Sequence, residues 1–270
     1  MRSYTYLYPE KADGGIDYTD PMLAAETAAT YVKQGFTAVK FDPAGAYTTL
    51  DPHQPALEDI SRSEAFLKAI REAVGDSADL LFGTHGQFSV SGAKRMARMM
   101  ETYDPLWFEE PTPPERPELM AEVAAATRIP IASGERLTTK YEFAQLLQHR
   151  AADILQPNLG RCGGILEGKK IASMAEAWHA QIAPHLYCGP VVAAANIQLA
   201  ATCPNFLILE SIRRFDGFMA ELLETPIHWQ DGFIEVPESP GIGVAIREDI
   251  ARAHPWQGDD LHIMPTEATA

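Results

Sequence analysis

Residues 107–111 read Trp-Phe-Glu-Glu-Pro, a short apolar run that ends on two carboxylates and a proline. Residues 129–135, Ile-Pro-Ile-Ala-Ser-Gly-Glu, repeat this arrangement and end on Glu135. Polar residues close similar apolar runs at an interval of roughly 25 residues, which is typical of one strand and one returning helix. In chain order they are Lys40, Asp42, His85, Glu109, Glu135, Asn158, His185 and Glu210. This period predicts an α/β fold, a TIM-type (β/α) barrel whose polar strand ends meet at one mouth.

The repeat extends over most of the chain. The tyrosine-rich run at residues 2–8 is the first predicted strand and residues 207–209 are the eighth, with seven helices between them. Later the period is lost and Pro, Gly and Asp accumulate. We therefore expect a parallel α/β barrel over residues 1–215 and an irregular C-terminal tail over residues 216–270. The connection at residues 43–58 is unusually long for such a fold, and loops of that size are commonly functional.

Composition narrows the classes of function. The chain has 270 residues and is 46% hydrophobic, enough for one large core. Its net charge of −15 argues against nucleic acid or an anionic membrane surface as a partner, although a locally positive site could still bind a small anion. The three cysteines show no metal-binding spacing, and no apolar run is long enough to span a membrane. These features predict a cytoplasmic protein.

The two glutamates are the strongest candidates for a metal site. Glu109 and Glu135 end neighbouring strands, so their carboxylates should lie close together. Oxygen ligands of this kind suit a hard divalent cation such as Mg²⁺. A single glutamate here would more often be a salt-bridged residue at the rim, but two at matched strand ends favour metal binding.

Histidine and lysine at other strand ends suggest acid–base chemistry. His85 lies between Thr84 and Gly86, and His185 follows Ala183-Pro184; each is a candidate catalytic acid or base, with a structural hydrogen-bonding role as the alternative. Lys40 ends a buried strand, where a cation needs a partner. It either binds a substrate carboxylate or forms a salt bridge with Glu109 or Glu135. Glu210 is either a proton donor or orienting group, or a rim residue without a catalytic role.

Residues 1–215 resemble the mandelate racemase-like branch of the enolase superfamily. The resemblance rests on four short motifs: Trp107-Phe108-Glu109-Glu110-Pro111, Gly134-Glu135-Arg136, Arg161-Cys162-Gly163-Gly164 and Ala183-Pro184-His185. It implies abstraction of a proton α to a carboxylate, with the enediolate held on Mg²⁺. It also implies that Glu109 and Glu135 are metal ligands and that Lys40 faces the substrate carboxylate. His85-Gly86 is similar to the His-Gly pair of the galactonate dehydratase-like group, and His185 matches the histidine of the seventh strand.

Three departures from the family pattern affect these expectations. Gly83 stands where relatives place their first metal-binding aspartate, so we expect Asp42 to supply the third carboxylate. Asn158 replaces the aspartate that orients the seventh-strand histidine, so His185 should be less basic and better suited to donating a proton. The chain opens directly at the first barrel strand, so we expect it to lack the usual N-terminal capping domain. The 216–270 tail resembles the segment that returns to that domain.

Together these features predict an Mg²⁺-dependent lyase, an acid-sugar dehydratase. His85 would remove the α-proton, while Glu109, Glu135 and Asp42 hold the metal and His185 assists departure of the β-hydroxyl group. One alternative is a cycloisomerase of an anhydro- or lactone sugar acid, which would use the same residues. Another is a catalytically impaired barrel that serves as an assembly module, favoured by Gly83 and by the expected lack of a cap. Because barrels of this kind are often multimeric, we also expect a homo-oligomer.

Overall fold

A computed structural model describes residues 1–42 and 53–255. It contains eight parallel strands in the order β7-β6-β5-β4-β3-β2-β1-β8. Their bounds are β1 Ser3–Tyr6, β2 Ala38–Phe41, β3 Asp79–Gly83, β4 Trp107–Glu109, β5 Ile131–Ser133, β6 Ile154–Leu155, β7 Gln181–Ile182 and β8 Leu209–Ser211. The predicted succession of eight strands is confirmed, with ends shifted by a few residues. Most of the predicted loop at residues 43–58 lies outside the described residues.

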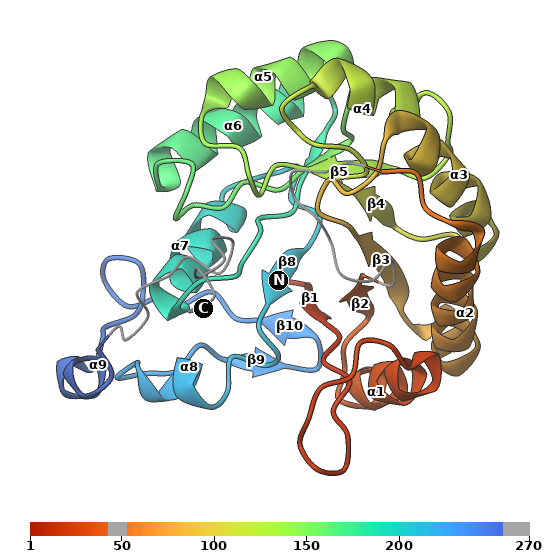
Figure 1. The fold of residues 1–270 in the computed structure, drawn as a ribbon. Helices are drawn as coiled ribbons and strands as arrows, with labels where there is room; N and C mark the ends of the chain where they lie inside the picture. The colour runs from red at the N-terminus through yellow and green to blue at the C-terminus, as the bar shows by residue number, and fades with distance from the viewer. Residues whose placement is uncertain (43–52, 256–270) are drawn as a thin grey trace, which may run out of the picture.

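Seven helices alternate with these strands and cover the outside of the sheet (Figure 1). They are α1 Pro21–Lys33, α2 Leu57–Val74, α3 Val90–Met100, α4 Pro117–Ala124, α5 Lys140–His149, α6 Ile165–Ala177 and α7 Pro190–Ala200; short 3₁₀ turns follow α2 and α3. Helix α1 begins at Pro21, where the Asp20 carboxylate accepts hydrogen bonds from the backbone N–H groups of Met22 and Leu23.

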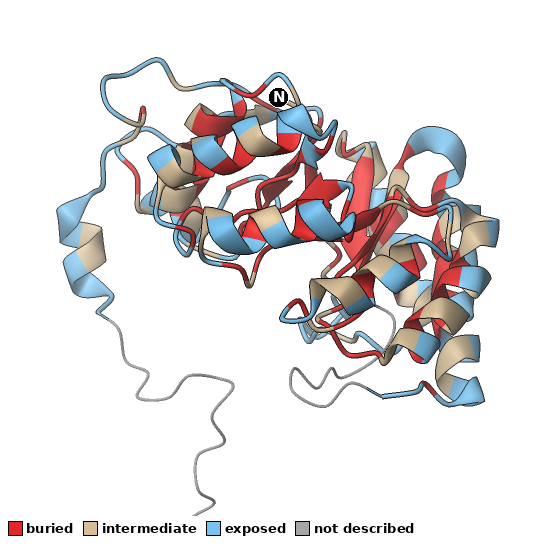
Figure 2. Cartoon of the chain, turned by 90° about the horizontal axis from the view of Figure 1, so that it is seen from above, coloured by how far each residue is buried: buried red, intermediate tan, exposed pale blue. Residues whose placement is uncertain are grey.

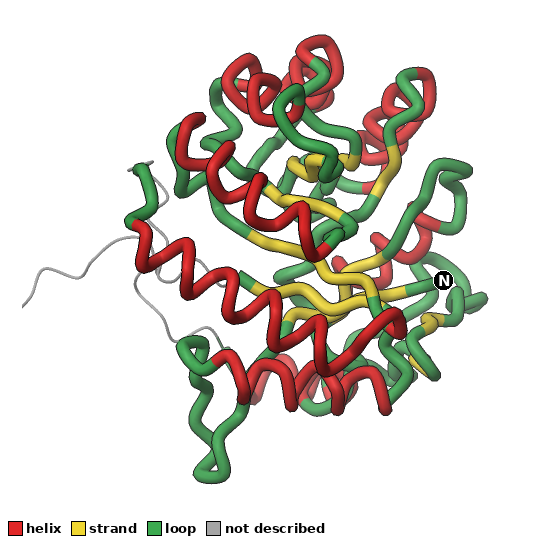
Figure 3. Tube along the Cα trace, turned by 90° about the vertical axis from the view of Figure 1, so that its right-hand side faces the viewer, coloured by secondary structure: helices red, strands yellow, loops and turns green. Residues whose placement is uncertain are grey.

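The sheet is curled so that its two ends meet. The backbone N–H of Ile182 in β7 donates to the carbonyl of Asn205, and the N–H of Leu207 donates back to Ile182, each at 2.9 Å. One inner cluster takes a buried residue from each strand or its immediate flank: Tyr4, Ala38, Leu81, Trp107, Ala132, Ile154, Ala183 and Ile208. The strands therefore surround a packed interior, as in a barrel. Figure 3 shows them enclosed by the helices.

The larger core lies between the strands and the helices. In α2 the predicted apolar face is confirmed: Phe66, Leu67, Ile70 and Val74 are all buried. Figure 2 shows that the buried parts of the helices face the strands and that their outer faces are exposed. This two-layer packing fixes the strand ends on which the candidate site depends.

The described part of the C-terminal segment consists of short elements. These are helix α8 Phe218–Glu221, the antiparallel strands β9 Trp229–Gln230 and β10 Phe233–Ile234, and helix α9 Glu248–Ala253. The turn between the two strands packs on Gly35, whose φ is +110° and whose added Cβ would lie 2.5 Å from the Cα of Asp231. The N–H of Ser3 donates to the Gly232 carbonyl at 2.9 Å. The segment is thus packed against the start of β1.

No helix within the described residues is long and apolar enough to cross a membrane.

Candidate active site

A polar layer follows the apolar inner cluster of the barrel. Side chains alternate between the two faces of a strand, so residues two positions after the inner cluster also face the interior. Two positions after Ala38, Leu81, Trp107, Ile154, Ala183 and Ile208 the sequence has Lys40, Gly83, Glu109, Gln156, His185 and Glu210. All six are buried. Four of the predicted site residues therefore lie in one layer at the carboxyl ends of the strands, where barrels of this type place their chemistry.

Lys40 and Glu109 form a buried ion pair in this layer. Their side chains are 3% and 1% exposed, and Lys40 Nζ lies 2.6 Å from Glu109 Oε1. A second carboxylate oxygen, Glu210 Oε1, lies 3.7 Å from the same ammonium. Burial by itself lowers the pKa of Lys40, but the charges of Glu109 and Glu210 outweigh it and raise the pKa well above its ordinary value. Lys40 is therefore a cation held between two carboxylates, and the predicted alternative of a salt bridge to Glu109 is present.

The second oxygen of Glu109 is held by two residues that the sequence did not single out. Trp107 Nε1 donates to Glu109 Oε2 at 3.1 Å, and Gln156 Nε2 donates to the same oxygen at 2.9 Å. Burial raises the pKa of Glu109, and the Glu135 carboxylate raises it further against the opposing effect of Lys40. The alternation rule could have found Gln156, because it lies two residues before Asn158 on a buried strand.

His185 lies between Asn158 and two carboxylates. Asn158 Oδ1 accepts a hydrogen bond from the N–H of Gly160 at 2.8 Å, which leaves its Nδ2 to donate to His185 Nδ1, also at 2.8 Å. His185 Nε2 lies 3.4 Å from Glu135 Oε2 and 4.0 Å from Glu210 Oε2. Because Nδ1 accepts, this network assigns the neutral ring's proton to Nε2. The predicted contact between Asn158 and the His185 ring is confirmed.

Glu135 is 7% exposed and lies two residues beyond β5. Burial by itself raises the pKa of this carboxyl, but the electrostatic effects of His185 and then Lys40 outweigh it and lower the pKa to about 2. Glu135 is therefore ionised near neutral pH, beside a ring that can donate a proton.

His85 and Asp42 form a second pair. His85 Nδ1 lies 3.4 Å from Asp42 Oδ2, and Gln87 Nε2 lies 3.5 Å from Asp42 Oδ1. Burial lowers the pKa of His85, but the hydrogen bond with Asp42 and the charge of Glu135 outweigh burial and raise it. The structure thus places the Asp42 carboxylate against His85.

The loop that carries His85 is fixed by an ion pair beneath it. Arg136 Nε donates to the buried Glu110 Oε2 at 2.9 Å, and Arg136 Nη2 donates to the backbone carbonyl of His85 at 3.0 Å. Gly86 has a φ of +68°, and an added Cβ would collide with Arg136 and lie 3.0 Å from the Cα of Pro113. Glycine at position 86 therefore allows Arg136 to hold the His85 backbone in place.

The carboxylates fit a divalent cation in part. Glu109 and Glu135 are buried oxygen donors from adjacent strand ends, and their mutual repulsion is of the kind that a bound dication relieves. Within the described residues, no group of three or more His, Cys, Asp or Glu side chains is arranged to hold a metal ion. The roles of Glu109, Glu135 and Asp42 as metal ligands therefore stay predictions.

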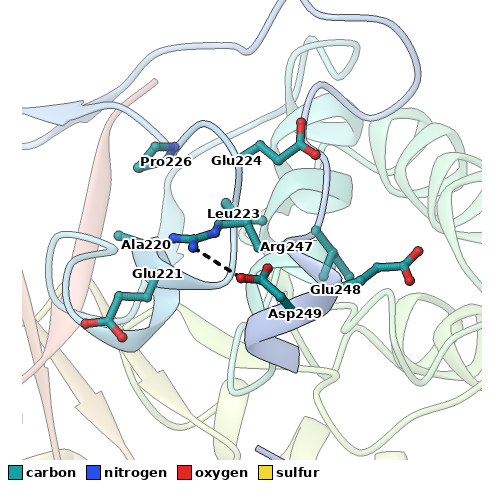
Figure 4. A pocket seen from close by; sticks show the side chains of 9 residues that line it. Ala220, Glu221, Leu223, Glu224, Pro226, Arg247, Glu248 and Asp249 are labelled. Atoms are coloured by element: carbon teal, nitrogen blue, oxygen red, sulfur yellow. Dashed lines mark hydrogen bonds and ion pairs between the residues drawn. The ribbon is translucent and has the colours of Figure 1, made fainter. Parts of the chain in front are cut away.

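A separate open pocket lies in the C-terminal segment (Figure 4). It is lined around α8 and α9 by residues that include Glu221, Glu224, Glu248 and Asp249, with Arg247 paired to Asp249 at 3.4 Å. None of the polar residues at the barrel strand ends lines it. The pocket is therefore separate from the strand ends, which remain the candidate active site.

Comparison with known proteins agrees with this geometry. A model of the enolase C-terminal domain-like family matches residues 23–250. The D-xylonate dehydratase of Haloferax volcanii is 35% identical over 265 residues, and the D-gluconate dehydratase of Thermoproteus tenax is also 35% identical over 265 residues. Each match covers 97% of this chain, but only 63% and 52% of the respective relatives, so the chain spans about half to two thirds of their length. A solved mandelate racemase/muconate lactonizing enzyme from Sulfitobacter sp. is 56% identical, with a TM-score of 0.94, and the match covers 99% of this chain and 67% of that one.

Proposed function

The chain belongs to the enolase C-terminal domain-like family, and from that membership we propose that it is the barrel of a sugar-acid dehydratase, a hydro-lyase. The dehydratase names of the relatives at 35% identity support the reaction class. The observation that carries the proposal is the difference between the two histidines at Nδ1: Nδ1 of His85 faces a carboxylate, whereas Nδ1 of His185 accepts a hydrogen bond from an amide. Two histidines in such different surroundings suit the two proton transfers of a dehydration.

His85 is the proposed base. Its Nδ1 faces Asp42, and Nε2 is the nitrogen proposed to take the proton from the carbon next to the substrate carboxylate. The C–H electron pair then passes into the enediolate, and the β C–O bond breaks as the double bond forms. The carboxylate of Asp42 stabilises the imidazolium that His85 becomes, as a charged partner does in other His–carboxylate pairs.

His185 is the proposed acid. The hydrogen bond that it accepts at Nδ1 from Asn158 leaves the Nε2 proton available to the departing β-hydroxyl group, which leaves as water. The resulting enol tautomerises to a 2-keto-3-deoxy acid. Glu210, whose Oε2 accepts a hydrogen bond from the N–H of Leu186 at 2.7 Å, orients the loop next to His185.

Mg²⁺ is the proposed cofactor, with Glu109 and Glu135 as ligands and Asp42 as the candidate third. When bound, it would supply positive charge that stabilises the enediolate. Lys40 contributes a further positive charge in the same layer and is the proposed partner of the substrate carboxylate. The proposed substrate is thus a small anionic sugar acid, for which the positive charges of Lys40 and the metal would offset the carboxylates around them.

The test is formation of keto acid from a panel of five- and six-carbon aldonic acids in the presence of Mg²⁺. We expect turnover of at least one open-chain acid by the 270-residue chain, and loss of at least about a hundredfold in rate in His85→Asn and in His185→Asn. His149→Asn, at an exposed position, is the matched control. Product from anhydro- or lactone acids alone would indicate the cycloisomerase instead. Absence of turnover on both panels would favour the assembly-module alternative.

A further inference from the structure

Glycine occupies the inward-facing position at the end of β3. The space taken by a neighbouring side chain explains this, and the backbone conformation does not. Gly83 is not among the residues with positive φ, so its conformation is open to other residues. A Cβ added there would lie 2.9 Å from Lys40 Cε and 3.7 Å from Lys40 Cγ. The side chain of Lys40 therefore passes through the space that a larger residue at position 83 would fill.

That path brings the Lys40 ammonium to Glu109. Gly83 pairs in register with Glu109, so the space left by the glycine lies directly beside the carboxylate. The 2.6 Å ion pair occupies the Oε1 oxygen of Glu109, and hydrogen bonds from Trp107 and Gln156 occupy its Oε2. Glu109 Oε1 keeps a second lone pair, so a metal ion that binds there shares this oxygen with the Lys40 ammonium or displaces it. Lys40 is the partner whose charge also repels a cation.

We propose that Gly83 is a positioning residue that lets the Lys40 ammonium serve as the resident cation of Glu109, so that Lys40 and a divalent metal ion compete for this carboxylate. The inference rests on the metal proposed above for Glu109 and Glu135. It predicts that the metal binds more weakly than the two buried carboxylates alone would allow.

The test measures equilibrium binding of Mg²⁺ by calorimetry and of Mn²⁺ by electron paramagnetic resonance. In Lys40→Met we expect binding to tighten by about tenfold or more, because a like charge next to the ligand has been removed. In Gly83→Ala we expect a smaller tightening, because the new methyl group pushes the Lys40 stem away from Glu109. Gly189→Ala is the matched glycine control, since its added Cβ meets nothing within 4 Å. Lys94→Met, which removes an exposed partner of Glu122, is the matched charge control.

The outcomes separate this inference from the proposed function. Tighter binding in Lys40→Met cannot arise from damage to the site, which would weaken binding. Unchanged or weaker binding in both Lys40→Met and Gly83→Ala overturns the inference while leaving the dehydratase proposal standing. If Lys40→Met does not fold, Gly83→Ala alone decides, because it retains the ammonium. Absence of metal binding in every variant overturns the inference together with the Mg²⁺ assignment, whereas keto-acid formation is scored separately.

Discussion

Asn158 donates its amide N–H to Nδ1 of His185 across 2.8 Å, and this bond sets the tautomer of the ring. A neutral amide gives direction to the imidazole but adds no charge that would stabilise imidazolium. Asp42, in contrast, presents a carboxylate to His85 at 3.4 Å. At Nδ1, the histidine of the third strand end therefore faces a charged partner, and the histidine of the seventh strand end faces a neutral one.

The first prediction changes the partner of His185. In Asn158→Asp we expect the proton of the neutral His185 ring to move from Nε2 to Nδ1, because a carboxylate accepts a hydrogen bond where the amide donated one. The ¹⁵N chemical shifts of the two ring nitrogens distinguish these tautomers directly. Asn158→Ala, which removes the partner without adding an acceptor, is the control. An unchanged tautomer in Asn158→Asp would contradict the assigned contact.

The second prediction concerns the pH dependence of turnover. The pKa of His85 is raised, and a base must be deprotonated, so kcat/KM should rise with pH as His85 loses its proton. In Asp42→Asn the hydrogen bond to a carboxylate is lost, the pKa of His85 falls, and the rising limb of the profile should move to lower pH. The maximal rate should also fall, because imidazolium is less stabilised. A lower rate with an unmoved limb would instead favour Asp42 as a metal ligand that does not act through His85.

The third prediction concerns the Gly86 turn beneath His85. Gly86→Ala should lower the free energy of unfolding by about 1–3 kcal/mol, because alanine is strained at φ +68° and its Cβ collides with Arg136. It should also lower kcat by displacing the Arg136 contact to the His85 backbone. Gly14→Ala is the matched control, since Gly14 has a φ of +83° with nothing within 4 Å of an added Cβ. Urea unfolding of the two variants separates the effect of crowding from that of backbone strain. Equal losses of unfolding free energy in both would show that the collision with Arg136 contributes nothing to the loss.

Much of the arrangement could be predicted from the sequence, because the alternation of strand side chains is a geometric rule. Because Trp107 lies in the apolar cluster, Glu109, two residues later, faces the polar layer above it. His185 follows Ala183 in the same way. The period of strands and helices predicted the order of the elements for a similar reason. The contact between Asn158 and His185 was expected from the family resemblance, in which the residue at position 158 orients the seventh-strand histidine.

The choice among partners within the layer could not be predicted. Lys40 can reach more than one carboxylate, and only the space beside Gly83 directs it to Glu109. Asp42, predicted to join the two glutamates at a metal, has its carboxylate 3.4 Å from His85 Nδ1, a contact that sequence spacing does not resolve. Gln156 was not predicted because an amide within an apolar strand gives no chemical signal until its acceptor is known.

Gln156 supplies the last prediction. Gln156→Leu removes one of the two donors to the buried Glu109 Oε2 and leaves the bond from Trp107, so the unfolding free energy at pH 7 should fall by about 1–3 kcal/mol. The hydrogen bond from Gln156 favours the ionised form of Glu109 and lowers its pKa, so the loss of this bond raises that pKa. The sign of the pH effect follows: the cost is largest where Glu109 is ionised and shrinks as pH falls and the carboxyl becomes protonated. Urea unfolding across this range measures it, with Gln148→Leu on the exposed end of α5 as the control. A loss that did not change with pH would mean that Gln156 acts through packing and not through the charge of Glu109.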